Sequence, residues 1–120
     1  MFQGLRTVIY HVPDLAAARA WYTAAFGVAP YFDEPFYVGF EIGGYELGLH
    51  PATPGTVTGD SVVAYWGVPG IGAAHAALVA RGAVPRDPIA EVGGDIKVAA
   101  LADPWGNVIG IIENPHFRGA

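Results

Sequence analysis

The chain has 120 residues, a length that suits one domain. Apolar residues make up 52% of it and charged residues only 14%, and so short a chain buries too small a share of its surface to hide that much apolar area alone. We therefore expect a homodimer interface, an apolar ligand cavity, or both. The formal charge of −5, with no run of lysine or arginine, argues against nucleic acid as a partner.

Cysteine is absent, which excludes disulfides, thiolate metal ligands and a cysteine nucleophile. Residues 1–6 lack the charged start and apolar stretch of a signal peptide, and no apolar run approaches the ~20 residues that a membrane span needs. We therefore expect a cytoplasmic protein with no membrane partner.

The first fifty residues predict a strand, a helix and three further strands. Residues 5–12 are rich in β-branched and aromatic side chains, which favour a strand. Asp14 is expected to cap the helix that follows, and Gly27 to end it. The remaining strands are expected at about 30–33, 36–42 and 45–50, with Gly43-Gly44 as the hairpin turn between the last two.

Residues 51–60, PATPGTVTGD, have the composition of a linker, and after them the pattern begins again. A strand is expected over 61–68 and an Ala-rich helix over 70–81, ended by Gly82. Further strands are expected near 83–86, 96–103 and 108–113, with DPWGN as the turn between the last two. The similar segments GVAPYF and GAVPRD, one after each helix, show the repeat directly.

Two helices for about eight strands favour hairpin connections, which are antiparallel, over a doubly wound parallel sheet. We therefore predict an α+β fold of two βαβββ modules in a single domain over 1–120. Module 1 is expected at about 4–50, the linker at about 51–60 and module 2 at about 61–114.

Three segments resemble the vicinal oxygen chelate superfamily, which includes glyoxalase I, extradiol dioxygenases and bleomycin-resistance proteins. They are HVPDL with the Trp21-Tyr22 pair of the first helix, the linker between the repeats, and DPWGNVIGIIEN. The resemblance covers roughly residues 4–114. It implies mixed, strongly curved sheets that form an open cup, with paired modules that enclose a small-molecule cavity. It also implies a bacterial-type protein that forms a dimer.

In metal-dependent members of this superfamily, four side chains, typically His, Glu or Gln, hold one divalent ion. Counted from the family pattern, these positions fall on Thr7, Gly48, Val63 and Gly110. A threonine hydroxyl is a poor ligand, glycine has no side chain and valine is apolar. A register shift of one residue brings no better ligand to any of them. We therefore predict no metal and no cofactor, and this departure counts against glyoxalase and dioxygenase activity.

A few side chains remain as candidates for binding a ligand. Alternation along the strands places polar and aromatic residues on the open face of the cup. The polar residues are expected to anchor a ligand, and Tyr65 with Phe36, Tyr37 or Phe40 is expected to form an aromatic wall. The alternatives are a His–Glu–His group that binds a metal or acts as a base, a solvated polar rim, and ordinary core packing. The candidates are Thr7, His11, Glu46, His50, Phe40 and Tyr65.

Two functions from different classes are consistent with these residues. One is metal-independent binding of a small hydrophobic, aromatic or partly cationic compound or antibiotic in a dimer-lined cavity, as in bleomycin-resistance proteins. The other is an enzyme: a metal-independent isomerase or lyase with His11 or Glu46 as base, or a glyoxalase- or dioxygenase-like enzyme with an unusual site. We favour binding. The sequence identifies neither a catalytic residue nor the ligand.

Overall fold

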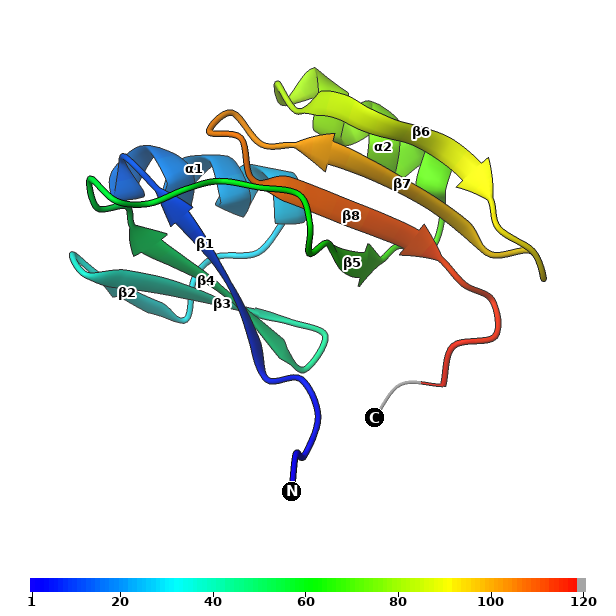
Figure 1. The fold of residues 1–120 in the computed structure, drawn as a ribbon, viewed down its shortest axis with the longest axis horizontal. Helices are drawn as coiled ribbons and strands as arrows, with labels where there is room; N and C mark the ends of the chain where they lie inside the picture. The colour runs from blue at the N-terminus through cyan, green and yellow to red at the C-terminus, as the bar shows by residue number, and fades with distance from the viewer. Residues whose placement is uncertain (119–120) are drawn as a thin grey trace. The chain divides into compact units, whose positions relative to one another are not determined.

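The computed structural model describes residues 1–118 and divides the chain into two compact units (Figure 1). Unit 1 is Met1–Thr58, and unit 2 begins at Gly59. The boundary lies within the expected linker. Each unit has one helix and one open, mixed four-stranded sheet, so the predicted α+β fold of two βαβββ modules is confirmed.

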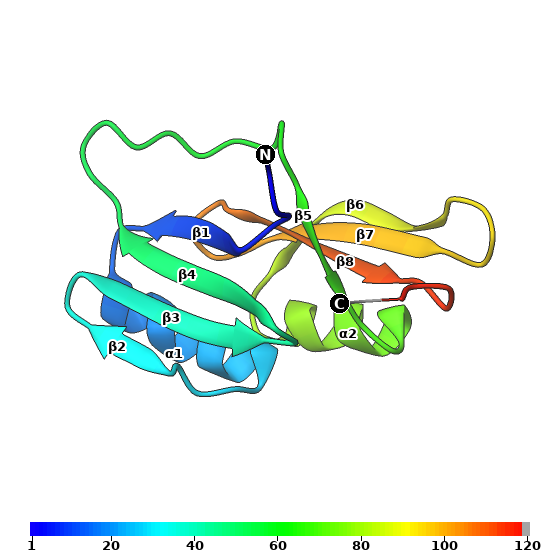
Figure 2. The same cartoon turned by 90° about the horizontal axis from the view of Figure 1, so that it is seen from below.

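Unit 1 has the strand order β1-β4-β3-β2, in which β1 pairs parallel with β4 and the other neighbours pair antiparallel. Helix α1 lies against one face of this sheet (Figure 2). The other face carries no element of unit 1. The elements are β1 (Thr7–Val12), α1 (Leu15–Phe26), β2 (Phe32–Glu34), β3 (Tyr37–Ile42) and β4 (Tyr45–Pro51).

Local signals in the sequence set the ends of α1 and the register of the β3–β4 hairpin. The Asp14 carboxylate accepts a hydrogen bond from the backbone N–H of Ala17 at 3.1 Å, as an N-cap does. Gly27 ends the helix in the left-handed region, with φ of 72°. Gly43 and Gly44, with φ of 57° and 93°, form the two-residue turn that pairs the strands tightly.

Unit 2 repeats this topology with the strand order β5-β8-β7-β6, and α2 packs on its sheet. Gly70 has no side chain to cap α2, and the Glu113 carboxylate accepts the N–H of Ile71 at 2.9 Å instead. The buried Asp103 carboxylate accepts the backbone N–H groups of Trp105 and Asn107, which fixes the DPWGN turn. The elements are β5 (Ala64–Gly67), α2 (Ile71–Ala80), β6 (Val84–Glu91), β7 (Lys97–Ala102) and β8 (Val108–Glu113).

The clearest difference from the expected elements is β6, which continues to Glu91 although the sequence predicts an end near 86. Pro85 and Pro88 lie within it, and proline removes a ladder hydrogen bond. An edge strand tolerates this, and the pairing of β6 with β7 is irregular at this segment. None of the described helices is both long and apolar enough to cross a membrane.

Candidate functional site

The face of the unit 1 sheet away from α1 gathers most of the candidate residues. On the helix side, the side chains of Tyr10, Val12, Val38, Phe40, Leu47 and Leu49 are buried and form the core. Alternation along each strand places the intervening residues on the other side, here called the open face. These residues are Thr7, Ile9 and His11 of β1, Glu46, Gly48 and His50 of β4, Tyr37, Gly39 and Glu41 of β3, and Phe32 and Glu34 of β2.

Glu46 lies in the middle of a group of three side chains, here called the Glu46 cluster, that also contains Tyr31 and Tyr37. The hydroxyl of Tyr37 donates to Glu46 Oε2 at 2.5 Å, and the hydroxyl of Tyr31 donates to Glu46 Oε1. The backbone N–H of Tyr31 donates to the carbonyl of Gly39 at 3.0 Å, which ties the segment before β2 to β3. Both carboxylate oxygens of Glu46 therefore have a phenol donor.

Two glycines opposite each other on β3 and β4 leave room for these rings. A Cβ atom on Gly48 would overlap the Tyr37 hydroxyl and would lie 2.6 Å from the Tyr37 Cζ atom. A Cβ atom on its partner Gly39 would lie 3.3 Å from the Tyr31 ring and 3.4 Å from the Tyr37 ring. The tyrosine rings thus pack against backbone that has no side chain, which is the close approach that glycine allows.

The hydrogen bonds of the Glu46 cluster fix the charges of its members. Donation from Tyr31, then from Tyr37, lowers the pKa of the Glu46 carboxyl below its ordinary value. The bond to Glu46 raises the pKa of Tyr31, while desolvation and then the same acceptor raise the pKa of Tyr37. Near neutral pH the cluster is therefore one carboxylate and two protonated phenols. A carboxylate of this kind is a weak general base and a stable negative charge.

His11 and His50 form a second, separate pair on the open face. They are opposite each other on the parallel strands β1 and β4, and their ring centroids are 5.1 Å apart. The Nδ1 atom of His50 is 2.8 Å from the carbonyl oxygen of Pro51.

Glu46 lies four residues before His50 on β4, about 13 Å along the strand at ~3.3 Å per residue, and is opposite Thr7. The alternative of a joint His–Glu–His group is therefore wrong. Over residues 1–118, no three or more His, Asp or Glu side chains come together in a way that would hold a metal ion.

Phe40 does not belong to the expected aromatic wall. It is opposite Leu47 on the helix side of the sheet and is fully buried. Positions of even number on β3 point toward α1, so the aromatic side chain that β3 presents to the open face is Tyr37. Phe40 is therefore corrected from a ligand-binding candidate to a core residue.

Tyr65 of unit 2 repeats the feature seen at Gly48. It is opposite Gly110 across β5 and β8, and the residue is 46% exposed. A Cβ atom on Gly110 would lie 2.7 Å from the Tyr65 ring, 2.7 Å from the carbonyl oxygen of Ala64 and 2.9 Å from Val63. No side chain fits at Gly110 unless its neighbours move.

The four positions that the family resemblance assigns to the ligands of a divalent ion carry residues that are poor metal ligands. Gly48 and Gly110 have no side chain, and aromatic rings occupy the space that one would need. Val63 is apolar, and the Thr7 hydroxyl donates to the backbone carbonyl of Glu46 at 3.3 Å. None of the four supplies an anionic or imidazole ligand of the kind that divalent metals prefer.

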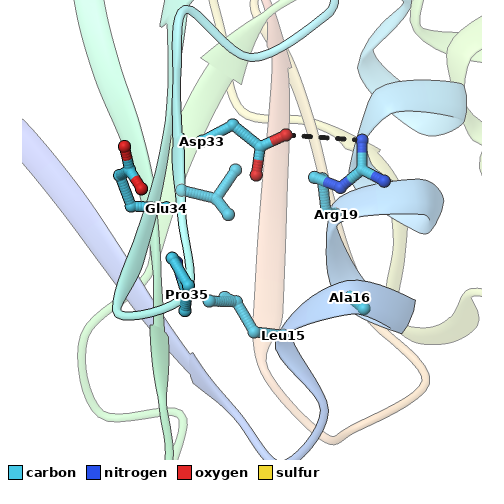
Figure 3. A pocket seen from close by; sticks show the side chains of 7 residues that line it. Leu15, Ala16, Arg19, Asp33, Glu34 and Pro35 are labelled. Carbon is cyan, nitrogen blue, oxygen red and sulfur yellow. Dashed lines mark ion pairs between the residues drawn. The ribbon is translucent and has the colours of Figure 1, made fainter.

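A wide-open pocket of about 410 Å³ lies between α1 and the β2–β3 hairpin, on the helix side of the sheet. Arg19 and Asp33 point toward each other across it and form an ion pair at 3.6 Å (Figure 3). Both side chains are nearly half exposed, and such pairs contribute little to stability. Sequence reasoning missed this pocket, because its residues carry no motif. The lining is Leu15, Ala16, Arg19, Asp33, Glu34, Pro35 and Val38.

Sequence reasoning also missed the role of Tyr31 and placed Tyr37 only among the options for the aromatic wall. One signal could have found Tyr37. The Gly43-Gly44 turn fixes the β3–β4 register and so puts Tyr37, Gly39, Glu46 and Gly48 on one face.

Two βαβββ units, each with its helix on one side of an open mixed sheet, define a known class of α+β protein. A family model of the Glyoxalase/Bleomycin resistance protein/Dioxygenase superfamily matches residues 4–111. The chain belongs to this superfamily, as the sequence resemblance predicts. No curated protein is similar enough to match.

Solved structures with less than 25% identity share the fold. A glyoxalase-related enzyme from Fulvimarina pelagi is 22% identical with a TM-score of 0.81, over 99% of this chain and 94% of that one. A glyoxalase/bleomycin resistance protein/dioxygenase family enzyme from Burkholderia phytofirmans PsJN is 21% identical with a TM-score of 0.78, over 92% and 98%. A putative glyoxalase family protein from Bacillus anthracis is 20% identical with a TM-score of 0.77, over 95% and 97%.

Proposed function

We propose that this chain is a small-molecule-binding member of its superfamily that works without the usual divalent-metal site and holds a hydrophobic or aromatic compound. The observation that carries the proposal is the filling of two metal-ligand positions. Gly48 lies beneath Tyr37, and Gly110 beneath Tyr65. The space that a ligand side chain would need at each position holds an aromatic ring instead.

The state of Glu46 supports binding over catalysis. A general base must have an oxygen available for a substrate proton and a pKa near the working pH. Both oxygens of Glu46 accept phenol hydrogen bonds, and these bonds lower its pKa. Such a carboxylate acts by its charge and position, as a binding group does.

Exposed aromatic residues in and around β2 favour an apolar or aromatic ligand body. Tyr31 and Phe36 are 65% and 62% exposed, and Phe32 lies beside Tyr37 with ring centroids 6.1 Å apart. Binding sites for small molecules are lined predominantly by such side chains, with a few polar groups that fix orientation. The proposal includes a homodimer and a cytoplasmic location, both of which stay predictions.

Elemental analysis with native mass spectrometry tests the proposal. The protein would be purified without chelators from cells supplied with zinc, nickel, manganese and iron. We expect far less than one divalent metal per chain, and a co-purified small molecule or a rise in Tm with added aromatic compounds. About one metal per chain would overturn the proposal.

A matched pair of variants locates any metal that is found. His11→Ala with His50→Ala removes the imidazole pair, and Glu46→Ala removes the carboxylate four residues away. Loss of a stoichiometric metal in either variant would show a metal site outside the four family positions and would also contradict the proposal.

A further inference from the structure

The short segment that supplies both phenol donors of Glu46 is rich in aromatic side chains. Residues 31–37, YFDEPFY, contribute Tyr31, Phe32, Phe36 and Tyr37. The Phe32 ring is 6.0 Å from Phe36 in an edge-to-face arrangement and 6.1 Å from Tyr37. The two tyrosines donate directly to the carboxylate. The anionic group is thus held by two tyrosines, and Phe32 and Phe36 extend the aromatic surface away from Tyr37. Tyr31, Phe32 and Phe36 are exposed.

The charges around this group have one sign. The strand residues of the open face include three carboxylates, Glu34, Glu41 and Glu46, and no lysine or arginine. Unit 1 has only two arginines in all, and neither is paired with these residues. Arg19 pairs with Asp33, and the Arg6 guanidinium donates to the backbone carbonyls of residues 3–5 and to the Gln3 side chain. The open face therefore has a negative potential that its own unit does not neutralise.

We propose that the Glu46 cluster binds an organic cation, namely an ammonium group carried on an aromatic body. The inference rests on the proposed function and names the ligand class of that site. The negative face of an aromatic ring attracts a cation, and a fixed carboxylate adds a direct charge partner. An anion would be repelled, and a neutral compound would cover the charge of Glu46 without compensating it.

The phenol hydrogen bonds suit this role because they orient the carboxylate and keep it ionised. Gly39 and Gly48 let the Tyr31 and Tyr37 rings lie close to the sheet. The ligand therefore meets a charge that is held in place and does not depend on a flexible glutamate side chain.

Isothermal titration with three probes of similar size tests the charge preference. Phenyltrimethylammonium is the cation, tert-butylbenzene its neutral isostere, and benzenesulfonate the anion. We expect the cation to bind about tenfold or more tightly than the neutral isostere, and the anion not to bind. Binding of the cation should weaken as salt is raised. Equal affinity for the cation and the neutral isostere would overturn the proposal, as would the absence of cation binding.

Variants locate the site. Glu46→Gln keeps the size of the side chain and an oxygen acceptor, and should weaken cation binding at least about tenfold. Glu91→Gln removes the same charge from exposed β6 of unit 2 and should leave binding unchanged. Tyr31→Ala, at a largely exposed ring, gives a second test if Glu46→Gln is unstable, and should also weaken binding. Unaltered binding in a folded Glu46→Gln or Tyr31→Ala variant would overturn the proposal.

The outcomes separate this inference from the function on which it rests. If the neutral isostere binds as well as the cation to a metal-free protein, the proposed binding function stands and the cation inference fails. If the protein carries stoichiometric metal, the proposed function fails whatever the probes do.

Discussion

Glu41 and Glu46 are directly opposite each other on β3 and β4, an arrangement in which like charges normally destabilise a sheet. Each carboxylate has its own donors. Glu41 accepts the backbone N–H of Gly44 at 2.6 Å, and Glu46 accepts the hydroxyls of Tyr31 and Tyr37. These bonds offset the repulsion locally, so the pair is tolerated as long as the Glu46 cluster is intact.

The Glu46 cluster should therefore give the protein a pH-dependent stability. The pKa of Glu46 is lowered in the folded state, so its contribution is present above the ordinary value of 4.5 and is lost as the pH falls through the folded pKa. The pKa values of Tyr31 and Tyr37 are raised, so their contribution is present below about 10 and is lost as the pH rises further. The full contribution spans the range between these limits.

Urea unfolding measured at intervals from about pH 7 to about pH 3 checks the acid limb. We expect the wild type to lose more free energy of unfolding over this range than a Tyr31→Phe/Tyr37→Phe double variant, in which Glu46 has lost its phenol donors. Tyr65→Phe in unit 2 is the control and should keep the wild-type slope. An acid slope in the double variant as steep as in the wild type would contradict the assignment.

At the level of elements, an added Cβ atom should have opposite effects on stability at the strand glycines and at a helix glycine. Gly48 of β4 and Gly110 of β8 occupy equivalent places, each in the strand that pairs parallel with the first strand of its unit. A Cβ atom at Gly48 meets a tyrosine side chain, which can move. A Cβ atom at Gly110 also meets the backbone oxygen of Ala64 at 2.7 Å, which cannot move without distorting β5.

Alanine substitution should separate these cases. Gly48→Ala should destabilise by roughly 1–3 kcal/mol through displacement of Tyr37, and Gly110→Ala by at least as much. Gly72→Ala in α2 is the control: nothing lies within 4 Å of its added Cβ atom. It should stabilise by up to about 1 kcal/mol, because alanine favours a helix over glycine. Urea unfolding of the three variants measures this. A Gly110→Ala variant as stable as Gly72→Ala would contradict the close packing of Tyr65 and Ala64.

The elements could be predicted where the signal is local. Asp14 caps α1, Gly27 ends it, and Gly43-Gly44 turns the hairpin, because each acts through its own backbone or a neighbour a few residues away. The length of β6 could not be predicted in this way. Proline normally marks the end of a strand, and β6 continues past its two prolines because it lies at the edge of the sheet.

The candidate site could be predicted only in part. Alternation places Thr7, His11, Glu46 and His50 on one face, since their strands are regular. The distance along the strand that separates Glu46 from the histidines follows from the pairing of β1 with β4. The bonds of Tyr31 and Tyr37 to Glu46 depend on how two long side chains cross a glycine pair, and no local pattern encodes such a tertiary arrangement.

At the scale of the whole molecule, each unit has an aromatic ring over a strand glycine, but the ring comes from a different strand in the two units. In unit 1 the ring over the strand glycine comes from Tyr37 of β3, and in unit 2 it comes from Tyr65 of β5. Covering the glycine thus does not depend on one repeated motif. The superfamily fold is kept in both units while the residues of the site differ, which is why the fold alone does not assign the activity.

The apolar surface of the chain leads to the prediction of a homodimer. Large apolar side chains are exposed in both units, among them Ile9 and Phe36 in unit 1 and Val84 and Ile89 in unit 2. With 52% apolar and 14% charged residues, a chain of 12.5 kDa has few charged side chains to cover this surface. Light scattering coupled to size exclusion should give twice the chain mass at micromolar concentration, because obligate interfaces commonly bury upwards of ~2,000 Å² and persist on dilution. A mass of one chain at that concentration would contradict the prediction, and would leave the exposed apolar residues to be explained by ligand binding alone.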